Sequence, residues 1–482
     1  MNSLVERIKV YIKDLELDFS DLFLAIGFLF SVPFYAFAWK FMVTTDPSQV
    51  FFKPWMMISC FAITAICWAI YFYLEIKNKR IGNRIFLFTY IFFVVLSLIV
   101  VLVQPKYSSV MVEAKHVNDV SIAHYPGISV GDMVQVDTVI SDTHRLFFSF
   151  ATIVITTVFY IVLFILPKRI KNTNFLILVG VIIFIFLFVL SVYSYITESQ
   201  KYIPFIKALF KGDVEEIYKN SMSSFVVQRV PYGACMMLGT MFALVLHALT
   251  NKKYWLIPLA YCYINMIFSY CKTSLALSFF AMAFYFAMRL FATYKDHKKR
   301  NKIIGIIYAS IVGVASLVVA ISLISQGKFA PLVYKIFTSF TDSRTIRTRT
   351  YVWANINQRL SGGWWIIGRG FGTHNYMLYP MNLVNGDDVC PSHSTYYAVL
   401  GAGGVISLIG FLASYIYYGY VFVKCFKVDK YKAIGLSIGV LAFLLYSFTE
   451  GVNYLIMVFM FPLILYYHLI QRGIINKEVD AQ

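Results

Sequence analysis

The sequence predicts an all-α polytopic membrane protein with about twelve transmembrane helices. Hydrophobic residues make up 59% of the 482 residues, which is more apolar surface than a single soluble core would bury. These residues also recur in runs of roughly twenty along the whole chain, the length that an α-helix needs to cross a bilayer. We therefore expect a bundle of spanning helices rather than a soluble domain with one anchor.

The predicted spans follow a short amphipathic segment. Residues 1–20 are charged and lack the apolar stretch of a cleavable signal sequence, so we expect a helix on the cytoplasmic surface. Nine spans within 21–325 and three within 394–471 follow, and 472–482 form a cytoplasmic tail. The spans are 21–40, 54–75, 85–104, 145–167, 174–197, 230–250, 254–271, 273–293, 303–325, 394–423, 433–449 and 452–471.

The distribution of positive charge predicts the orientation. More than half of the 42 Lys and Arg residues lie in the terminal segments and in the alternate short connections that face one side. Cytoplasmic loops carry such an excess, so both termini are predicted to be cytoplasmic. The net charge of +18 is thus mostly a matter of topology and does not indicate nucleic-acid binding. The seven cysteines lack metal-ligand or disulfide patterns.

Two long loops on the outer side have different patterns. Residues 105–144 alternate apolar and polar side chains, which favours short strands. Their histidines lack metal-ligand spacing, so we interpret this loop as a cap or a partner-binding loop. In 198–228, apolar residues interleave with lysines, which predicts a helix lying in the outer interface. This helix could simply pack there or steer a lipid substrate.

The third outer loop, 326–393, is predicted to contain the functional site. It carries seven Lys and Arg residues against three Asp, an excess that the positive-inside trend does not explain. An anionic substrate would explain it. Arg344, Arg347 and Arg349 lie in a predicted helix over 343–358, and guanidinium groups pair bidentately with phosphate oxygens. Contacts with anionic lipid headgroups or with loop carboxylates are the alternative.

Several motifs in this region resemble those of the O-antigen ligase and O-antigen polymerase superfamily. Arg349 stands four residues before Trp353, and the glycine-rich run 368–372 follows. His393 opens the sequence HSTYYAVLGAGGVISLIGF, with Gly404 eleven residues further on. The resemblance covers roughly 224–448.

Two upstream segments are also similar to this superfamily. Arg229 lies in VQRVPYGACMML, at the start of the sixth predicted span. Lys272 lies in YCKTSLAL, where relatives usually have arginine. A lysine keeps the positive charge there but loses the bidentate fork.

The resemblance implies a GT-C-like fold in the bacterial inner membrane, with a large periplasmic loop between helices 9 and 10. It implies transfer of a glycan from undecaprenyl diphosphate to an acceptor hydroxyl at the periplasmic face. The acceptor would be lipid A core for a ligase or a lipid-linked glycan for a polymerase. Neither a cofactor nor a metal ion is expected.

The chemistry of such a transfer suggests roles for the candidate residues. Arg229 and Arg349, with Lys272 as auxiliary, are predicted to bind the diphosphate, and His393 to act as the general base. His374 is the alternative base, although the spacing to Gly404 favours His393. Arg344, Arg347 and Glu450 are possible substrate contacts, or loop residues without a function in transfer.

Three functions are compatible with these motifs. The ligase is preferred, because twelve spans and the spacing of the histidine and glycine motifs fit it better than a polymerase. A lipid-linked glycan flippase or other transporter also needs a cationic cavity. It is disfavoured because no internal repeat is visible and the cations gather at the outer surface instead of the midplane.

Overall fold

The computed structural model of the chain describes a helical bundle. The longer described stretches are residues 19–27, 54–79, 84–103, 107–113, 133–139, 160–224, 229–294, 298–328, 362–368, 394–448 and 455–475. Outside these stretches only isolated residues are described, among them Trp353 and Ile356.

Helices occupy most of the positions predicted to span a membrane. The longer ones are α3 (Pro54–Lys77), α4 (Arg84–Val103), α7 (Asn174–Thr197), α10 (Arg229–Thr250), α11 (Leu256–Ser269), α12 (Lys272–Tyr294), α13 (Lys298–Ile324), α18 (Thr395–Phe426), α19 (Lys430–Tyr446) and α20 (Leu455–Gln471). The shorter ones are α6 (Leu166–Arg169), α8 (Tyr202–Lys211), α9 (Val214–Lys219) and α16 (Trp364–Ile367).

Within the described part of the chain, 5 helices are long and apolar enough to cross a membrane. These lie at 58–77, 174–197, 232–250, 272–290 and 395–426. Helices α19 and α20 have 17 residues each and α11 has 14, which is short for a span of about 20 residues. The structure therefore supports a helical membrane protein, while the number twelve stays a prediction.

Helix α10 lies at the centre of the bundle. It packs against α7, α11, α12 and α19. In α10, 78% of the most apolar 18-residue stretch is buried inside the protein, whereas in α7 the corresponding share is 28%. Met236, Met241 and Leu244 of α10 are fully buried, whereas Ile182 and Ile185 of α7 are each 59% exposed. This contrast is expected when α7 faces lipid and α10 faces only other helices.

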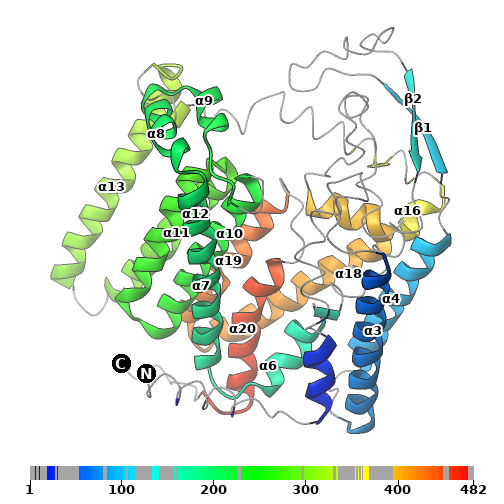
Figure 1. The fold of residues 1–482 in the computed structure, drawn as a ribbon. Coiled ribbons are helices and arrows are strands. Elements are labelled where there is room, and N and C mark those ends of the chain that lie inside the picture. The colour runs from blue at the N-terminus through cyan, green and yellow to red at the C-terminus, as the bar shows by residue number, and fades with distance from the viewer. Residues whose placement is uncertain are drawn as a thin grey trace.

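The two ends of the bundle differ in composition (Figure 1). One end carries α8, α9 and the two strands, and we call it the loop end. The opposite end carries the C-terminal ends of α3, α6, α10 and α20, and we call it the basic end, because Lys77, Arg169, Lys252 and Arg472 lie at or directly after these helix ends in the sequence. There the guanidinium of Arg472 donates to the backbone carbonyls of Lys168 and Ile170. Connections predicted to share one side of the membrane thus lie together.

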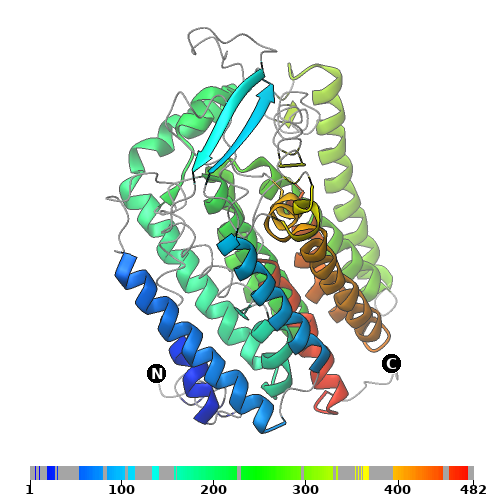
Figure 2. The same ribbon diagram turned by 90° about the vertical axis from the view of Figure 1, so that its right-hand side faces the viewer.

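Two strands lie in the segment 105–144, for which the sequence predicts an outer loop with short strands. Strand β1 (Tyr107–Glu113) pairs antiparallel with β2 (Met133–Val139), in a register from Tyr107 opposite Val139 to Glu113 opposite Met133. The hairpin lies at the loop end, above the helices (Figure 2). The prediction of strands is confirmed here, and the description of the chain as all-α needs this addition.

Candidate functional site

The structure describes two of the residues predicted to carry function. Arg229 and Lys272 are described, and they lie close together at the loop end. The remaining candidates lie outside the described residues, so their predicted roles stay predictions. They are Arg344, Arg347, Arg349, His374, His393 and Glu450.

Arg229 and Lys272 are the first residues of two neighbouring helices, α10 and α12. These helix starts approach each other closely because Gly233 has no side chain: a Cβ atom there would lie 2.4 Å from the Cβ of Cys271. Tyr270 ends α11 in the left-handed conformation, with φ of 48°. The chain can therefore turn within two residues and begin α12 at Lys272.

Both cations face one aromatic ring. The guanidinium carbon of Arg229 lies 4.1 Å from the ring centroid of Tyr218, and the Nζ of Lys272 lies 5.4 Å from the same centroid. Tyr270 meets Tyr218 edge to face at 5.4 Å, and an Nη of Arg229 donates to the Tyr270 carbonyl at 3.1 Å. A cation is attracted to an aromatic face within about 6 Å. Tyr218 of α9 therefore holds the two cations together.

The electrostatics of this cluster favour an anion. Among the described residues, no carboxylate lies within ion-pair distance of Arg229 or Lys272. The two helix N-termini add partial positive charge at the same place. Arg229 and Lys272 are partly exposed. The cluster therefore has donors to offer to an anionic ligand such as a phosphate.

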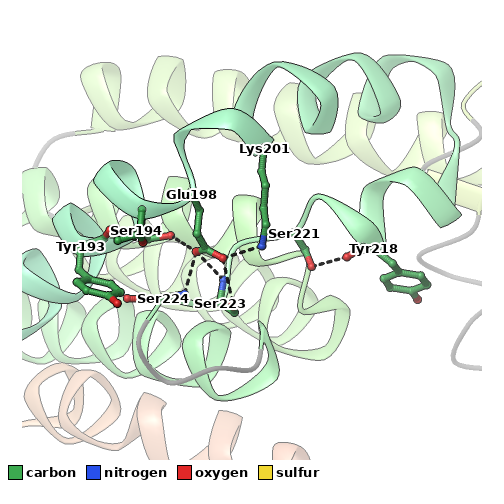
Figure 3. A network of polar contacts seen from close by, with 9 residues as sticks. Tyr193, Ser194, Glu198, Lys201, Tyr218, Ser221, Ser223 and Ser224 are labelled. Carbon is green, nitrogen blue, oxygen red and sulfur yellow. Dashed lines mark hydrogen bonds and ion pairs between the residues drawn. The ribbon is translucent and has the colours of Figure 1, made fainter.

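A partly buried carboxylate holds the segment a few residues before Arg229 (Figure 3). Glu198, directly after α7, accepts hydrogen bonds from the Nζ of Lys201 at 2.7 Å and from the Oγ of Ser194 at 2.6 Å. It also accepts from the backbone N–H groups of Ser223 and Ser224 at 3.1 and 2.9 Å. Glu198 thereby links the end of α7 to the residues just before α10.

The backbone at Ser224 needs this support. Its φ is 56°, a conformation that non-glycine residues rarely adopt. Its hydroxyl donates to the Leu190 carbonyl at 2.6 Å, and the neighbouring Met222 N–H donates to the Phe268 carbonyl at 3.0 Å. The strained segment is thus tied to both α7 and α11.

The pKa of Glu198 reflects this environment. Burial alone would raise it, but the hydrogen bonds from Lys201, Ser194, Ser224 and Ser223 outweigh burial and lower the pKa to about 2. The carboxylate therefore stays charged at any physiological pH. All these donors are groups of the protein itself, so the role of Glu198 is to hold the backbone at Ser223 and Ser224 in place.

Gly368 and Gly404, two glycines of the sequence motifs, lie where α16 meets α18, and these two helices form a second structural unit. Helix α18 is interrupted at Gly403 and Gly404, and Gly404 has φ of 62° and ψ of −161°. A Cβ atom on Gly404 would lie 2.2 Å from the Ile366 carbonyl oxygen, and one on Gly368 would lie 2.5 Å from the backbone of Ala402. The backbones of α16 and α18 therefore touch, and only glycine permits this approach.

The residues next to His393 are tightly packed. Ser394 and Thr395 are buried, and the Thr395 N–H donates to the Ser447 carbonyl at 2.8 Å. Ser447 ends α19. The structure thus joins the segment that follows His393 in the sequence to the segment that precedes Glu450.

An aromatic stack joins the arginine motif to the same helix. The rings of Trp353 and Tyr397 are parallel within 3° and 4.8 Å apart. Trp353 follows Arg349 by four residues, and Tyr397 follows His393 by four residues. Two motifs that the sequence separates by 44 residues are therefore anchored to each other.

Helix α19 connects the two units. It packs against α10 and α12, which begin at the cation cluster, and against α18, which follows His393.

In the described part of the chain, no group of three or more His, Cys, Asp or Glu side chains could hold a metal ion.

Sequence reasoning missed two residues of this site. Tyr218 was not predicted, because an exposed tyrosine in an amphipathic segment has no distinctive signal. Glu198 was not predicted either, although a carboxylate directly after a long apolar run is a signal that could have been used.

Comparison with known proteins adds no family assignment: no family model matches the chain, and no curated protein matches it.

Proposed function

We propose that the protein is a membrane glycosyltransferase that moves a glycan from undecaprenyl diphosphate to an acceptor hydroxyl at the periplasmic face. The observation that carries this proposal is the cation cluster, where Arg229 and Lys272 share the Tyr218 ring without a carboxylate partner among the described residues. A diphosphate is the leaving group in this reaction. Cations positioned for it would stabilise the charge that develops as it departs.

The proposed reaction follows from these groups. The bond between the sugar C1 and the diphosphate oxygen breaks, and a bond between the acceptor oxygen and C1 forms. His393 takes the proton of the acceptor hydroxyl, and Arg229, Arg349 and Lys272 hold the diphosphate that leaves. The contacts of Thr395 with Ser447 and of Tyr397 with Trp353 support this assignment, since they anchor the segment after His393.

The finer architecture belongs to the same proposal. A GT-C-like arrangement of about twelve helices in the bacterial inner membrane would put the basic end in the cytoplasm and the loop end in the periplasm. The clustering of Lys168, Arg169 and Arg472 at one end supports this orientation.

An O-antigen ligase acting on lipid A core is the preferred form of this activity. The sequence spacing from His393 to Gly404 supports it, and Gly404 is a position where only glycine fits. A surface polysaccharide polymerase is the second candidate. Loss of a ligase would leave long glycans on the carrier lipid, whereas loss of a polymerase would leave single repeat units.

The central experiment measures glycan transfer by purified protein in detergent, with a lipid diphosphate donor. Arg229→Ala, Arg349→Ala and His393→Ala are each expected to lower the rate at least about a hundredfold. Lys272→Arg is expected to keep activity, because the guanidinium preserves the charge and adds a fork. Lys219→Ala is the matched control, since Lys219 is exposed on α9 and pairs with Glu216.

Two results would contradict the proposal. Full transfer by the Arg229→Ala or His393→Ala protein would remove those residues from the mechanism. Absence of any transfer in detergent, combined with movement of lipid-linked glycan across sealed vesicles, would favour a flippase. A flippase needs a sealed membrane to show its activity, whereas a transferase does not.

A further inference from the structure

The short helix α8 at the loop end presents an apolar stripe that no described part of the protein covers. Ile203, Ile206 and Phe210 are 66%, 41% and 85% exposed, while Phe205 and Ala208 on the other side are buried. The three exposed residues follow the spacing i, i+3, i+7 and therefore share one face of the helix. Exposed apolar side chains of this size on a helix outside the spans mark a surface that contacts lipid or another protein.

Two lysines flank this stripe. Lys207 and Lys211 lie on α8 and both are exposed. At 100° per residue, Lys207 lies beside Ile203, and Lys211 lies further along the same flank. An apolar stripe with a basic edge is typical of helices that lie in a membrane interface, where the apolar side chains enter the acyl region and the lysines meet anionic headgroups.

The position of α8 along the chain brings it to the membrane surface. Helix α7 has 24 residues, which gives about 36 Å at 1.5 Å per residue, slightly more than the hydrocarbon core of about 30 Å. The end of α7 at Thr197 therefore reaches the interface. Only Glu198 and the turn Ser199–Lys201 separate it from α8, so the stripe lies at headgroup height.

The buried face of α8 connects this surface to the cation cluster. Phe205 lies 5.6 Å from Phe268 between ring centroids. Phe205, Ala208, Ile217 and Tyr270 form one buried hydrophobic cluster, and Tyr270 contacts both Tyr218 and Arg229. The same short helix thus supports the cation cluster and faces the lipid.

We infer that α8 is an interfacial helix that binds anionic phospholipid of the leaflet at the loop end. Ile203, Ile206 and Phe210 enter the acyl boundary, and Lys207 and Lys211 contact the headgroup phosphates. This contact sets the height of the Arg229 and Lys272 cluster relative to the leaflet. The inference concerns a lipid surface and does not depend on the proposed transfer reaction.

The test places a photo-reactive benzoylphenylalanine at position 210 in the full-length protein. The protein is reconstituted into vesicles of phosphatidylcholine alone, or of phosphatidylcholine mixed with phosphatidylglycerol, and the cross-linked species are identified by mass. We expect lipid adducts at position 210, with phosphatidylglycerol enriched several-fold over its share of the mixture. The same probe in place of Glu215, an exposed residue of α9, is expected to give few lipid adducts.

Charge variants complete the test. Lys207→Gln with Lys211→Gln is expected to remove the enrichment of phosphatidylglycerol while lipid adducts at position 210 persist. Lys219→Gln is the matched control, and it is expected to leave the enrichment unchanged. Adducts to a second copy of the chain instead of lipid, equal lipid adducts at 210 and 215, or enrichment that survives loss of both lysines would each overturn the inference. Thermal unfolding of each variant verifies that it is folded.

Discussion

Arg169 and Arg229 lie at opposite ends of the bundle, and both contact a tyrosine ring, yet their surroundings differ. Arg169 at the basic end forms ion pairs with Asp21 and, at 2.6 Å, with Glu75, whose side chain is 1% exposed. Arg229 at the loop end contacts Tyr218 and a backbone carbonyl, with no carboxylate partner among the described residues. The aromatic contact is common to both, so the carboxylates distinguish a structural arginine from one available to a ligand.

The largest effect is expected from removing the paired arginine. Arg169→Ala would remove a cation that pairs with the buried Asp21 and Glu75, and breaking a buried ion pair typically costs about 3–5 kcal/mol. We expect low abundance and a strongly lowered unfolding temperature in detergent, with little folded protein to assay. Arg229→Ala is the matched comparison and should lower stability by only about 1 kcal/mol. Equal losses of stability would contradict the distinction between the two arginines.

Gly404, where the backbones of α16 and α18 touch, is a second position expected to serve stability. Gly404→Ala would place a Cβ atom 2.2 Å from the Ile366 carbonyl oxygen, in a conformation with φ of 62°. We expect a loss of roughly 3 kcal/mol, because backbone faces backbone and neither can move cheaply. Gly419→Ala is the control in the same helix, since nothing lies within 4 Å of its added Cβ. Thermal unfolding of both variants measures the difference.

The next largest effect on stability is expected from Glu198, the carboxylate at the loop end whose oxygens accept several hydrogen bonds. Its pKa is lowered to about 2 from an ordinary 4.5, so its stabilising effect is complete above pH 4.5 and is lost as pH falls toward 2. This amounts to roughly 2–3 kcal/mol, and the side chain is only 12% exposed. Protection of the amides of residues 198–224 from hydrogen exchange, measured relative to their intrinsic exchange rates, should fall between pH 4.5 and 3.

A variant of Glu198 isolates this contribution. Glu198→Gln removes the titrating group, so protection of these amides relative to their intrinsic exchange rates should be lower at neutral pH and nearly independent of pH over the same range. Glu216→Gln is the control, because the Glu216 side chain is 47% exposed and its ion pair with Lys219 spans 3.5 Å. An unchanged pH dependence in the Glu198 variant would assign the effect to another group.

These sites also indicate what sequence reasoning can reach. Helix positions could be predicted, because apolar runs of about twenty residues leave few alternatives. Arg229 and Lys272 could be predicted as cations of one site only through a family resemblance, since 43 positions separate them in the sequence. Their shared contact depends on Tyr218, on Gly233 and on the left-handed Tyr270. None of these has a sequence pattern, because each depends on helix packing that only the folded chain defines.

The smallest effect is expected at Tyr218, the ring that Arg229 and Lys272 share. Tyr218→Leu would remove the ring that holds Arg229 and Lys272, and a partly exposed cation–π contact contributes about 0.5–1 kcal/mol. The proposed transfer should then show a donor KM raised roughly twofold to fivefold with kcat little changed, because positioning of the diphosphate would suffer before chemistry does. Tyr218→Phe keeps the ring and should behave like the unaltered protein. If the phenylalanine variant lost as much as the leucine variant, the hydroxyl and not the ring would be the group that matters. Tyr218 would then be a candidate substrate contact instead of a support for the cations.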